Sequence, residues 1–508
     1  MKDFSQKSKE KIITILLPIL STIFILGISL LIYFFSKGYR INIPEGQITK
    51  TGVLTVKTDP LTASLFINNE SSGRTPNSKS LDIGDYDVSV RKDKYFDWNQ
   101  KVSVQEEIST LVFPWLVLKD PEKTEKWNSS STLISSWISK DYNTIVFLLK
   151  DTEEKFTLWN YKVNTSLWDF SSNPSEIISL ENNKFELTIS PNGQYAILKL
   201  TSTPEKIYIL ETQKSNTLEN AKTFDISNYK KYSIKWAEDN NHIILESSKE
   251  ILSYDTIRQN IYKIVEKGTD KKYIWSTDKE GFFYLITNST QEFENSYVYT
   301  LNQYKLDGTQ QKTIIENIYL QKDKQYIDYY RTNGYTSTPF TNSVENTQTV
   351  GQVSEIKVFQ DAKGAAIKTE YATYWYDINT SKYLMISPYS LNILDIAPDQ
   401  KRILLTSDKD LLVFTFDKDE ADHTEEIGTK VILQIENTKD IRWISNSTNI
   451  YFQKDNHFYI ADKAGTNQYQ IIDTTNIKNA IVKNSRESIV TLEVGTDNKV
   501  YINEYKIH

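Results

Sequence analysis

The sequence predicts an all-β protein apart from one N-terminal transmembrane helix, with a small β-sandwich followed by a seven- or eight-bladed β-propeller. Three observations indicate this fold. An uncharged apolar run lies near the N-terminus, a short stretch of alternating strands follows it, and a strand-turn-strand pattern recurs through the rest of the 508 residues. The 32 Tyr, 21 Phe and 10 Trp favour sheet. Apolar residues make up 39% of the chain, enough for a sizeable core.

The apolar run at residues 12–35 reads IITILLPILSTIFILGISLLIYFF and contains no charge. A helix of this length spans about 36 Å at about 1.5 Å per residue, which is enough to cross a bilayer. The run exceeds the apolar region of a cleaved signal peptide and no small-residue cleavage site follows it, so we favour an uncleaved anchor over a cleaved signal. Residues 1–11 hold four lysines and two acidic residues, which predicts a cytoplasmic tail and extracytoplasmic C-terminal domains. The expected localisation is therefore the cytoplasmic membrane, crossed once, with the N-terminus inside.

Residues 36–49 are predicted to be a polar tether, and residues 50–115 a small β-sandwich. Strand-like segments of alternating apolar and polar residues occur at 54–58, 63–67, 86–90, 101–104 and 109–113. Asn68-Asn69 is a turn pair that tolerates positive φ, and Gly73-Arg74-Thr75-Pro76 marks a further turn. This spacing is typical of short antiparallel strands joined by tight turns.

The order of these turns and strands resembles the PEGA family of small β-sandwich modules on bacterial and archaeal envelope proteins. The matching segments are Thr58-Asp59-Pro60, residues 63–67, Gly73-Arg74-Thr75-Pro76, residues 81–88 and Lys94-Tyr95. The tetrapeptide that gives the family its name falls at Asp82-Ile83-Gly84-Asp85, where only the glycine matches, and Asn68-Asn69 replaces the usual Asp-Gly. The resemblance covers about 65 residues. It implies a surface or spacer role without catalysis.

From about residue 125 a repeat pattern predicts propeller blades, with residues 116–128 as a linker and 129–508 as the propeller. Each copy has an aromatic or aliphatic residue, a polar turn, an apolar strand and a second strand rich in aromatics. The copies begin at Trp137, Leu187, Trp236, Trp275, Ile396, Trp443 and Val482, with a degraded copy at 356–378. A period of about 40–50 residues with roughly four strands per unit is typical of propellers. Eight blades are expected, or seven if the degraded copy is an insertion.

Two turns in this region, Ser190-Pro191-Asn192-Gly193 and Ala397-Pro398-Asp399-Gln400, resemble the Ser-Pro-Asp-Gly turns of TolB-type bacterial propellers. The polar stretch 331–355 is predicted to be a long loop, either a binding protrusion or a plain connection. Tryptophans recur among the repeats at Trp137, Trp236, Trp275 and Trp443. We interpret them as packing between blades, in preference to a carbohydrate platform.

Recognisable catalytic chemistry is absent from the sequence. There is no cysteine, and the four histidines, His242, His423, His457 and His508, have no metal-binding spacing. The chain contains no P-loop, GxGxxG or GxSxG motif. The acidic run from Asp417 to Glu426 is interpreted as a solvated loop, without the fixed ligand positions of a calcium loop. No catalytic, cofactor-binding or metal-ligating residue is assigned, no cofactor is expected, and the residues that bind a ligand stay open.

The predicted function is that of a membrane-anchored binding or scaffold protein of a bacterial cell envelope. Its propeller would recognise a wall polymer or a protein partner, and residues 12–35 would contact the membrane. The net charge of −7 argues against nucleic acid as a partner. An exported propeller enzyme, a glycosidase or lyase acting on envelope glycan, is the alternative, and a purely structural role in a surface assembly is a third. Ligand identity, the binding face and the oligomeric state stay open.

Overall fold

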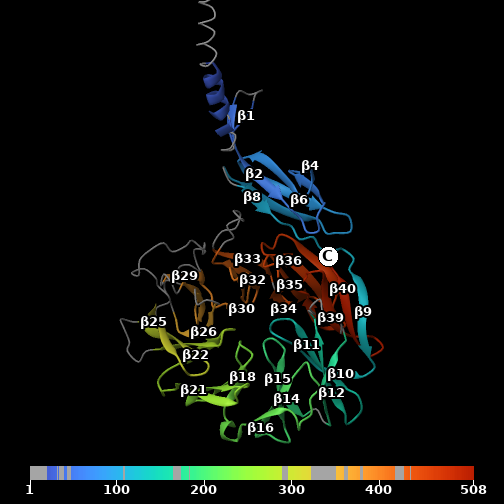
Figure 1. Cartoon of the computed structure of the whole chain (residues 1–508), viewed down its shortest axis with the longest axis vertical. Helices are drawn as coiled ribbons and strands as arrows, with labels where there is room; N and C mark the ends of the chain where they lie inside the picture. The colour runs from blue at the N-terminus through green and yellow to red at the C-terminus, as the bar shows by residue number, and fades with distance from the viewer. Residues whose placement is uncertain are drawn as a thin grey trace, which may run out of the picture. The chain divides into compact units, whose positions relative to one another are not determined.

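The computed structural model describes residues 20–30, 32–33, 39–42, 47–106, 109–163, 173–181, 184–288, 296–321, 351–359, 364–377, 382–417, 428–434, 436 and 438–508. These residues belong to two compact units, one that ends at Val117 and one that begins at Leu118 (Figure 1). Over these described residues the fold is all-β apart from one helix near the N-terminus and a short 3₁₀ turn at Ser227–Tyr229.

The N-terminal helix covers residues 20–30 and 32–33. It lies inside the predicted transmembrane segment 12–35, whose other residues, like the predicted tail 1–11, lie outside the described residues. Within the described part of the chain, no helix is long and apolar enough to cross a membrane. The membrane span therefore stays a prediction.

Besides the N-terminal helix, the described residues of the first unit form two four-stranded sheets. One sheet has the order β1 (Tyr39–Asn42), β2 (Gln47–Val56), β5 (Asn77–Asp82), with β8 (Ser109–Val112) parallel to β2. The other has the order β4 (Glu70–Arg74), β3 (Ser64–Ile67), β6 (Gly84–Arg91), β7 (Trp98–Val104). The predicted tether at 36–49 thus includes β1 and the start of β2. The two strands pair through their backbones, with Tyr39 opposite Lys50 and Asn42 opposite Gln47. Backbone pairing requires no buried side chain, so the polar sequence alone did not reveal this hairpin.

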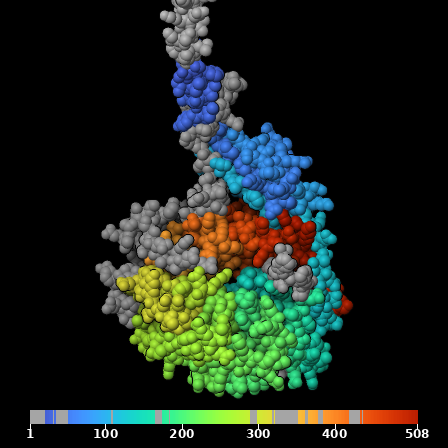
Figure 2. Space-filling model, in the orientation of Figure 1, coloured from blue at the N-terminus to red at the C-terminus, as the bar shows by residue number. Residues whose placement is uncertain are grey.

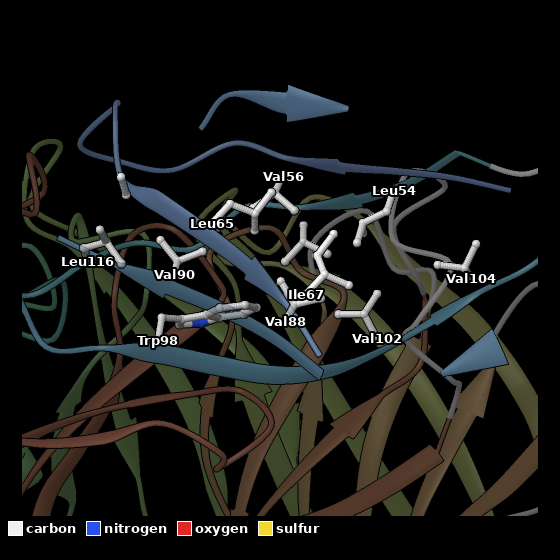
Figure 3. Close-up of a cluster of buried hydrophobic side chains, with 12 residues drawn as sticks. Leu54, Val56, Leu65, Ile67, Val88, Val90, Trp98, Val102, Val104 and Leu116 are labelled. Carbon is white, nitrogen blue, oxygen red and sulfur yellow. The ribbon is translucent and has the colours of Figure 1, made fainter. Parts of the chain in front are cut away.

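The core of this unit lies between its sheets (Figure 3). Alternate residues of each strand point inward, as the period of two requires. Leu65 and Ile67 of β3 meet Val88 and Val90 of β6, and Trp98 of β7 packs in the same cluster. At the β3–β4 turn, Asn68 and Asn69 adopt φ of 51° and 65°. The predicted turn chemistry is therefore present there.

The second unit contains eight four-stranded antiparallel sheets, counted over its described residues. The sheets are β10–β13 (Thr132–Ile138, Thr144–Lys150, Phe156–Lys162, Ser175–Leu180), β14–β17 (Phe185–Ile189, Tyr195–Leu200, Lys206–Glu211, Lys222–Asp225), β18–β21 (Ser233–Trp236, His242–Glu246, Glu250–Asp255, Asn260–Glu266), β22–β25 (Tyr273–Thr277, Phe282–Asn288, Ser296–Lys305, Gln311–Gln321), β26–β29 (Val353–Val358, Gly364–Thr369, Thr373–Asp377, Lys382–Ser387), β30–β33 (Asn392–Ile396, Arg402–Thr406, Asp410–Thr415, Gly428–Gln434), β34–β37 (Thr438–Trp443, Asn449–Lys454, His457–Asp462, Gln468–Asp473), and β38–β40 (Ile477–Val482, Ser488–Val494, Val500–Lys506) with β9 (Glu122–Ser129). The degraded repeat is the fifth sheet, β26–β29, and thus a blade.

The sheets follow one another around a ring, as the colours of the second unit show (Figures 1 and 2). The first strand of each sheet is the inner one, since most of the contacts between successive sheets join first strands: β14 with β18, β22 with β26, β30 with β34, and β10 with β38. The last contact brings the first and eighth sheets together. The arrangement is a β-propeller, as the sequence predicts.

The eighth sheet is completed by β9, which precedes the first sheet in the chain and pairs with β40. The predicted linker at 116–128 therefore contains a propeller strand. The strand reads EKTEKWNS, and its residues are exposed or half-buried. Its polarity suits an outer edge strand, and for that reason it looks like a linker in the sequence.

Hydrophobic clusters fill the spaces between neighbouring sheets. Each predicted tryptophan of the repeats packs into such a cluster, which confirms their interpretation as interblade residues: Trp137 between the first and second sheets, Trp236 between the second and third, Trp275 between the third and fourth, and Trp443 between the sixth and seventh. Their places on the inner strands differ. Trp236 and Trp443 end β18 and β34, whereas Trp137 and Trp275 lie earlier in β10 and β22.

Candidate binding site at the centre of the propeller

Apart from β26, whose following residues 360–363 lie outside the described residues, each inner strand leads into a tight turn, and hydrogen bonds join turns of neighbouring sheets. The turns close by backbone bonds such as Ser190 N–H to Tyr195 O (2.8 Å) and Ala397 N–H to Arg402 O (2.9 Å). Between sheets, the N–H of Asn192 donates to Oδ1 of Asn240 (2.7 Å). We call these linked turns the turn ring.

Further links of the turn ring join other pairs of sheets. The N–H of Asp141 donates to the carbonyl of Pro191 (2.9 Å), and the N–H of Asp399 donates to Oγ of Ser447 (2.9 Å). Such bonds fix these turns against one another. The backbone that carries the side chains at this end of the inner strands is therefore held in place by hydrogen bonds between sheets.

Three successive inner strands place a charged residue at their penultimate position, next to the turn ring. These residues are Lys357 of β26, Asp395 of β30 and Arg442 of β34. All three are half-buried. Charged side chains are seldom enclosed unless they are paired or bind something, so the group is the first candidate for a functional site.

Asp395 is held by backbone donors from two sheets. Its Oδ1 accepts the N–H of Ile396 (2.9 Å), and its Oδ2 accepts the N–H of Trp443 (3.5 Å). Burial raises the pKa of Asp395, whereas the positive charge of Lys357 and these two hydrogen bonds act to lower it. Burial lowers the pKa of Lys357, whereas the negative charge of Asp395 acts to raise it. The enclosure thus disfavours both charges, while their mutual attraction offsets part of that effect.

Two charged residues of the turn ring interact electrostatically with Lys357. Lys140, after β10, and Glu238, after β18, form an ion pair. The charge of each also acts on Lys357. The N–H of Glu238 donates to Oγ1 of Thr277 (3.0 Å), which fixes its backbone against the next sheet. We call Lys140, Glu238, Lys357, Asp395 and Arg442 the inner cluster.

Arg442 is flanked by aromatic rings. Its guanidinium lies 4.7 Å from the ring centroid of Tyr142, a cation–π contact. Across the β34–β35 ladder it is paired with Tyr451, so the two side chains share one face of the sheet. Burial lowers the pKa of Arg442. Among the described residues, no hydrogen-bond acceptor or carboxylate contacts its guanidinium.

The Tyr451 hydroxyl is buried without a hydrogen bond from any described residue. The residue is 3% exposed, and its ring stacks on Phe458 with centroids 5.2 Å apart. Burial raises the pKa of Tyr451, and the nearby charge of Arg442 opposes this rise. A buried hydroxyl without a partner is unfavourable by about 1–3 kcal/mol, so this one is a second sign of a site.

The histidines and carboxylates form no metal site in the described part of the chain, where no three His, Cys, Asp or Glu residues group as ligands. His242 lies between two carboxylates, with Nδ1 2.5 Å from Asp239 Oδ2 and Nε2 3.8 Å from Asp255 Oδ2. Asp239 also accepts the N–H groups of Asn241 and His242, which makes it a turn-capping residue. His423 lies outside the described residues.

The other loops of interest are not described. Residues 331–350 of the loop predicted at 331–355 lie outside the described residues, and so do residues 418–426 of the acidic run. The end of the predicted loop is wrong, since residues 353–355 belong to β26. The inner cluster was not assigned from the sequence. Its signal was a charged residue at the same place in three successive repeats, two residues before each turn.

Comparison with known proteins identifies the first unit. Residues 51–116 match the PEGA domain family. No curated protein matches the chain. Similar solved structures include an oligogalacturonate lyase from Vibrio parahaemolyticus (8% identity, TM-score 0.38, 76% of this chain and 98% of that one).

A further similar structure is the WD40 domain of SCAP from fission yeast, with 10% identity and a TM-score of 0.40 over 76% of this chain and 94% of that one. Another is the Swd1 β-propeller domain from Myceliophteria thermophila, with 8% identity and a TM-score of 0.37 over 76% of this chain and 100% of that one. Identities this low carry no information on substrate or partner. The chain thus combines a PEGA domain at residues 51–116 with a C-terminal β-propeller.

Proposed function

We propose that this chain is a membrane-anchored, extracytoplasmic binding or scaffold protein of a bacterial cell envelope. Its propeller serves as the recognition platform for a wall polymer or a protein partner, and the PEGA domain acts as a spacer. The protein is not an enzyme in this proposal.

The apolar N-terminal segment supports the anchor. The described helix carries exposed large apolar side chains around its circumference, at Leu20, Ile23, Phe24, Ile25, Leu26, Ile28, Leu30 and Ile32. A helix that is apolar on all sides suits a lipid environment better than water. The lysines of residues 1–11 favour a cytoplasmic N-terminus, which leaves the PEGA domain and the propeller outside.

The inner cluster is the single observation that carries the recognition role. Half-buried charges on a hydrogen-bonded turn ring form a preorganised polar surface, which lowers the entropy that ligand binding would otherwise lose. Charged groups of both signs suit a polar partner more than an apolar one.

The test uses the full chain in detergent micelles, mixed either with isolated cell-wall material or with solubilised envelope proteins. Co-sedimentation with the wall supports polymer recognition, and a stoichiometric protein partner supports a scaffold. A double variant, Lys357→Gln with Arg442→Gln, serves as the comparison. Failure to retain either wall or partner would refute the binding role.

A glycan-cleaving enzyme is the second candidate, because the inner cluster includes two carboxylates. Asp395, whose pKa is raised by burial, has the character of a general acid, and Glu238 could serve as its partner. Release of new reducing ends or unsaturated sugars from wall glycan, abolished by Asp395→Asn, would favour this activity. A wild-type chain that releases neither would exclude it for that glycan.

A further inference from the structure

Three hydrogen-bond donors of the propeller centre have no acceptor among the described residues. They are the hydroxyl of Tyr451, which is buried, and the ammonium of Lys357 and the guanidinium of Arg442, which belong to half-buried residues. Arg442 and Tyr451 are cross-strand neighbours, and the N–H of the next residue, Trp443, donates to Asp395, the electrostatic partner of Lys357. The three donors therefore belong to one region, at the ends of β26 and β34.

Several other enclosed cations of the same unit are paired with carboxylates. Lys267 lies 2.6 Å from Glu246, and Arg402, 2% exposed, lies 2.5 Å from Asp399. Lys483 lies 2.7 Å from Glu504. Lys357 and Arg442 differ from these paired cations, and beside them the Tyr451 hydroxyl is one of several buried polar groups without a partner among the described residues. An anionic ligand would give all three donors an acceptor.

The charges of the inner cluster select the chemistry of that ligand. The inner cluster holds three cations and two anions, and the half-buried Glu355 adds a further negative charge that acts on Lys357. The Asp395 carboxylate already accepts two backbone N–H groups, which stabilise its negative charge in place. Lys357 and Arg442 are therefore the groups left to attract a ligand, and both are donors without acceptor capacity.

We propose that Lys357, Arg442 and Tyr451 form a binding site for an oxyanion, a carboxylate or phosphate group carried on a polymer. Arg442 would bind two oxygens with its fork of N–H groups, while the Lys357 ammonium and the Tyr451 hydroxyl each donate one further bond. The proposal rests on the proposed function and names the chemistry of its polymer.

The test measures binding of the full chain in detergent micelles to immobilised polyphosphate, poly-glutamate and uncharged dextran. Binding to one or both polyanions and none to dextran is expected, and the preferred polyanion shows which oxyanion fits. Arg442→Gln and Lys357→Gln should each weaken binding by about 10-fold or more. Tyr451→Phe should weaken it by a few-fold.

Lys439→Gln is the matched control, since Lys439 is exposed on the same strand as Arg442 and the change removes the same charge. It should leave binding unchanged. An equal loss with Lys439→Gln would show diffuse electrostatic attraction and overturn the proposal, and so would equal binding to dextran. Circular dichroism and the Tyr451→Phe variant, which changes no charge, separate lost binding from lost folding.

The two proposals fail in different ways. If wild type and the Arg442→Gln variant sediment equally with cell wall, the oxyanion site is wrong while wall binding stands. If the polyanions bind as expected but neither cell wall nor an envelope protein does, the oxyanion site stands and the envelope role is wrong.

Discussion

Replacing Glu504 with glutamine tests how the eighth sheet closes the ring. Glu504 lies on β40, where Oε1 is 2.7 Å from Nζ of Lys483 and also accepts the Ser488 hydroxyl. Its Oε2 is 2.9 Å from Nζ of Lys126, which lies on β9. The carboxylate therefore joins the strand that precedes the first sheet to the strands that end the chain.

The size of the effect follows from the pKa of Glu504. Burial alone would raise that pKa, but the hydrogen bonds from Lys483, Ser488 and Lys126 outweigh it and lower the pKa from 4.5 to about 2. The difference corresponds to roughly 3 kcal/mol of stability at pH 7. Because the folded-state pKa is depressed, this stability is present above about pH 5 and disappears as the pH falls from about 4.5 to about 2. At pH 3, roughly 1–1.5 kcal/mol remains.

The assay is urea unfolding of the full chain in detergent micelles, followed by tryptophan fluorescence at pH 7 and pH 3. Glu504→Gln should lower the unfolding free energy by about 2–3 kcal/mol at pH 7 and by about half as much at pH 3. Hydrogen exchange of residues 122–129 should accelerate at pH 7, because β9 loses its link to β40.

Glu153→Gln is the control. Its carboxylate is 2.9 Å from Nζ of Lys150 but 93% exposed, so breaking this pair should change stability by no more than about 0.5 kcal/mol. Equal urea midpoints for the two variants would refute the reasoning. So would a loss for Glu504→Gln that is as large at pH 3 as at pH 7.

Three further predictions concern single side chains. Tyr451→Phe should raise the unfolding free energy by about 1 kcal/mol, because it removes a buried hydroxyl without a partner; a lower urea midpoint would contradict this. Gly193→Ala should lower the unfolding free energy by about 2–4 kcal/mol, since φ is +71° and the new Cβ would lie 2.5 Å from Cβ of Thr144. Gly308 has a similar φ of +72°, but its nearest atom would lie 3.5 Å from the new Cβ, so Gly308→Ala should lower the unfolding free energy by only about 1 kcal/mol. Similar midpoints for the two would argue against the clash. Leu65→Ala should destabilise the first unit by about 2–5 kcal/mol, measured by hydrogen exchange of its strands, and leave exchange in the propeller strands unchanged.

The fold was predictable from the sequence wherever local chemistry repeats. The strands of the PEGA domain alternate with a period of two, and the Asn68-Asn69 turn supplies the positive φ that its backbone needs. In the propeller, polar turns recur between apolar strands because each sheet must bury both faces against its neighbours. This reasoning also gave a blade at 356–378, where the apolar strands survive although the turn sequence is degraded.

What the sequence could not show depends on pairings between distant residues. The strand β9 has the composition of a linker, and only its partner β40, more than 370 residues later in the chain, makes it part of a sheet. The inner cluster draws on residues from Lys140 to Arg442, which closure of the ring brings together. A charged residue two positions before a turn does not predict a binding site when only one repeat is considered. It does so only when the same position is charged in neighbouring repeats, whose inner strands line the same centre.

Glu504 and the inner cluster show two uses of charge in one ring. Around Glu504, each cation has an oxygen within 2.9 Å, and removing the carboxylate should only destabilise. Around Arg442 the donors lack acceptors, so a change there should act on stability and on binding with opposite signs. Tyr451→Phe isolates this difference, since it alters one hydroxyl and no charge. A hydroxyl that merely filled space would give a more stable protein with unchanged polyanion binding, whereas a ligand-binding hydroxyl gives a more stable protein that binds less tightly.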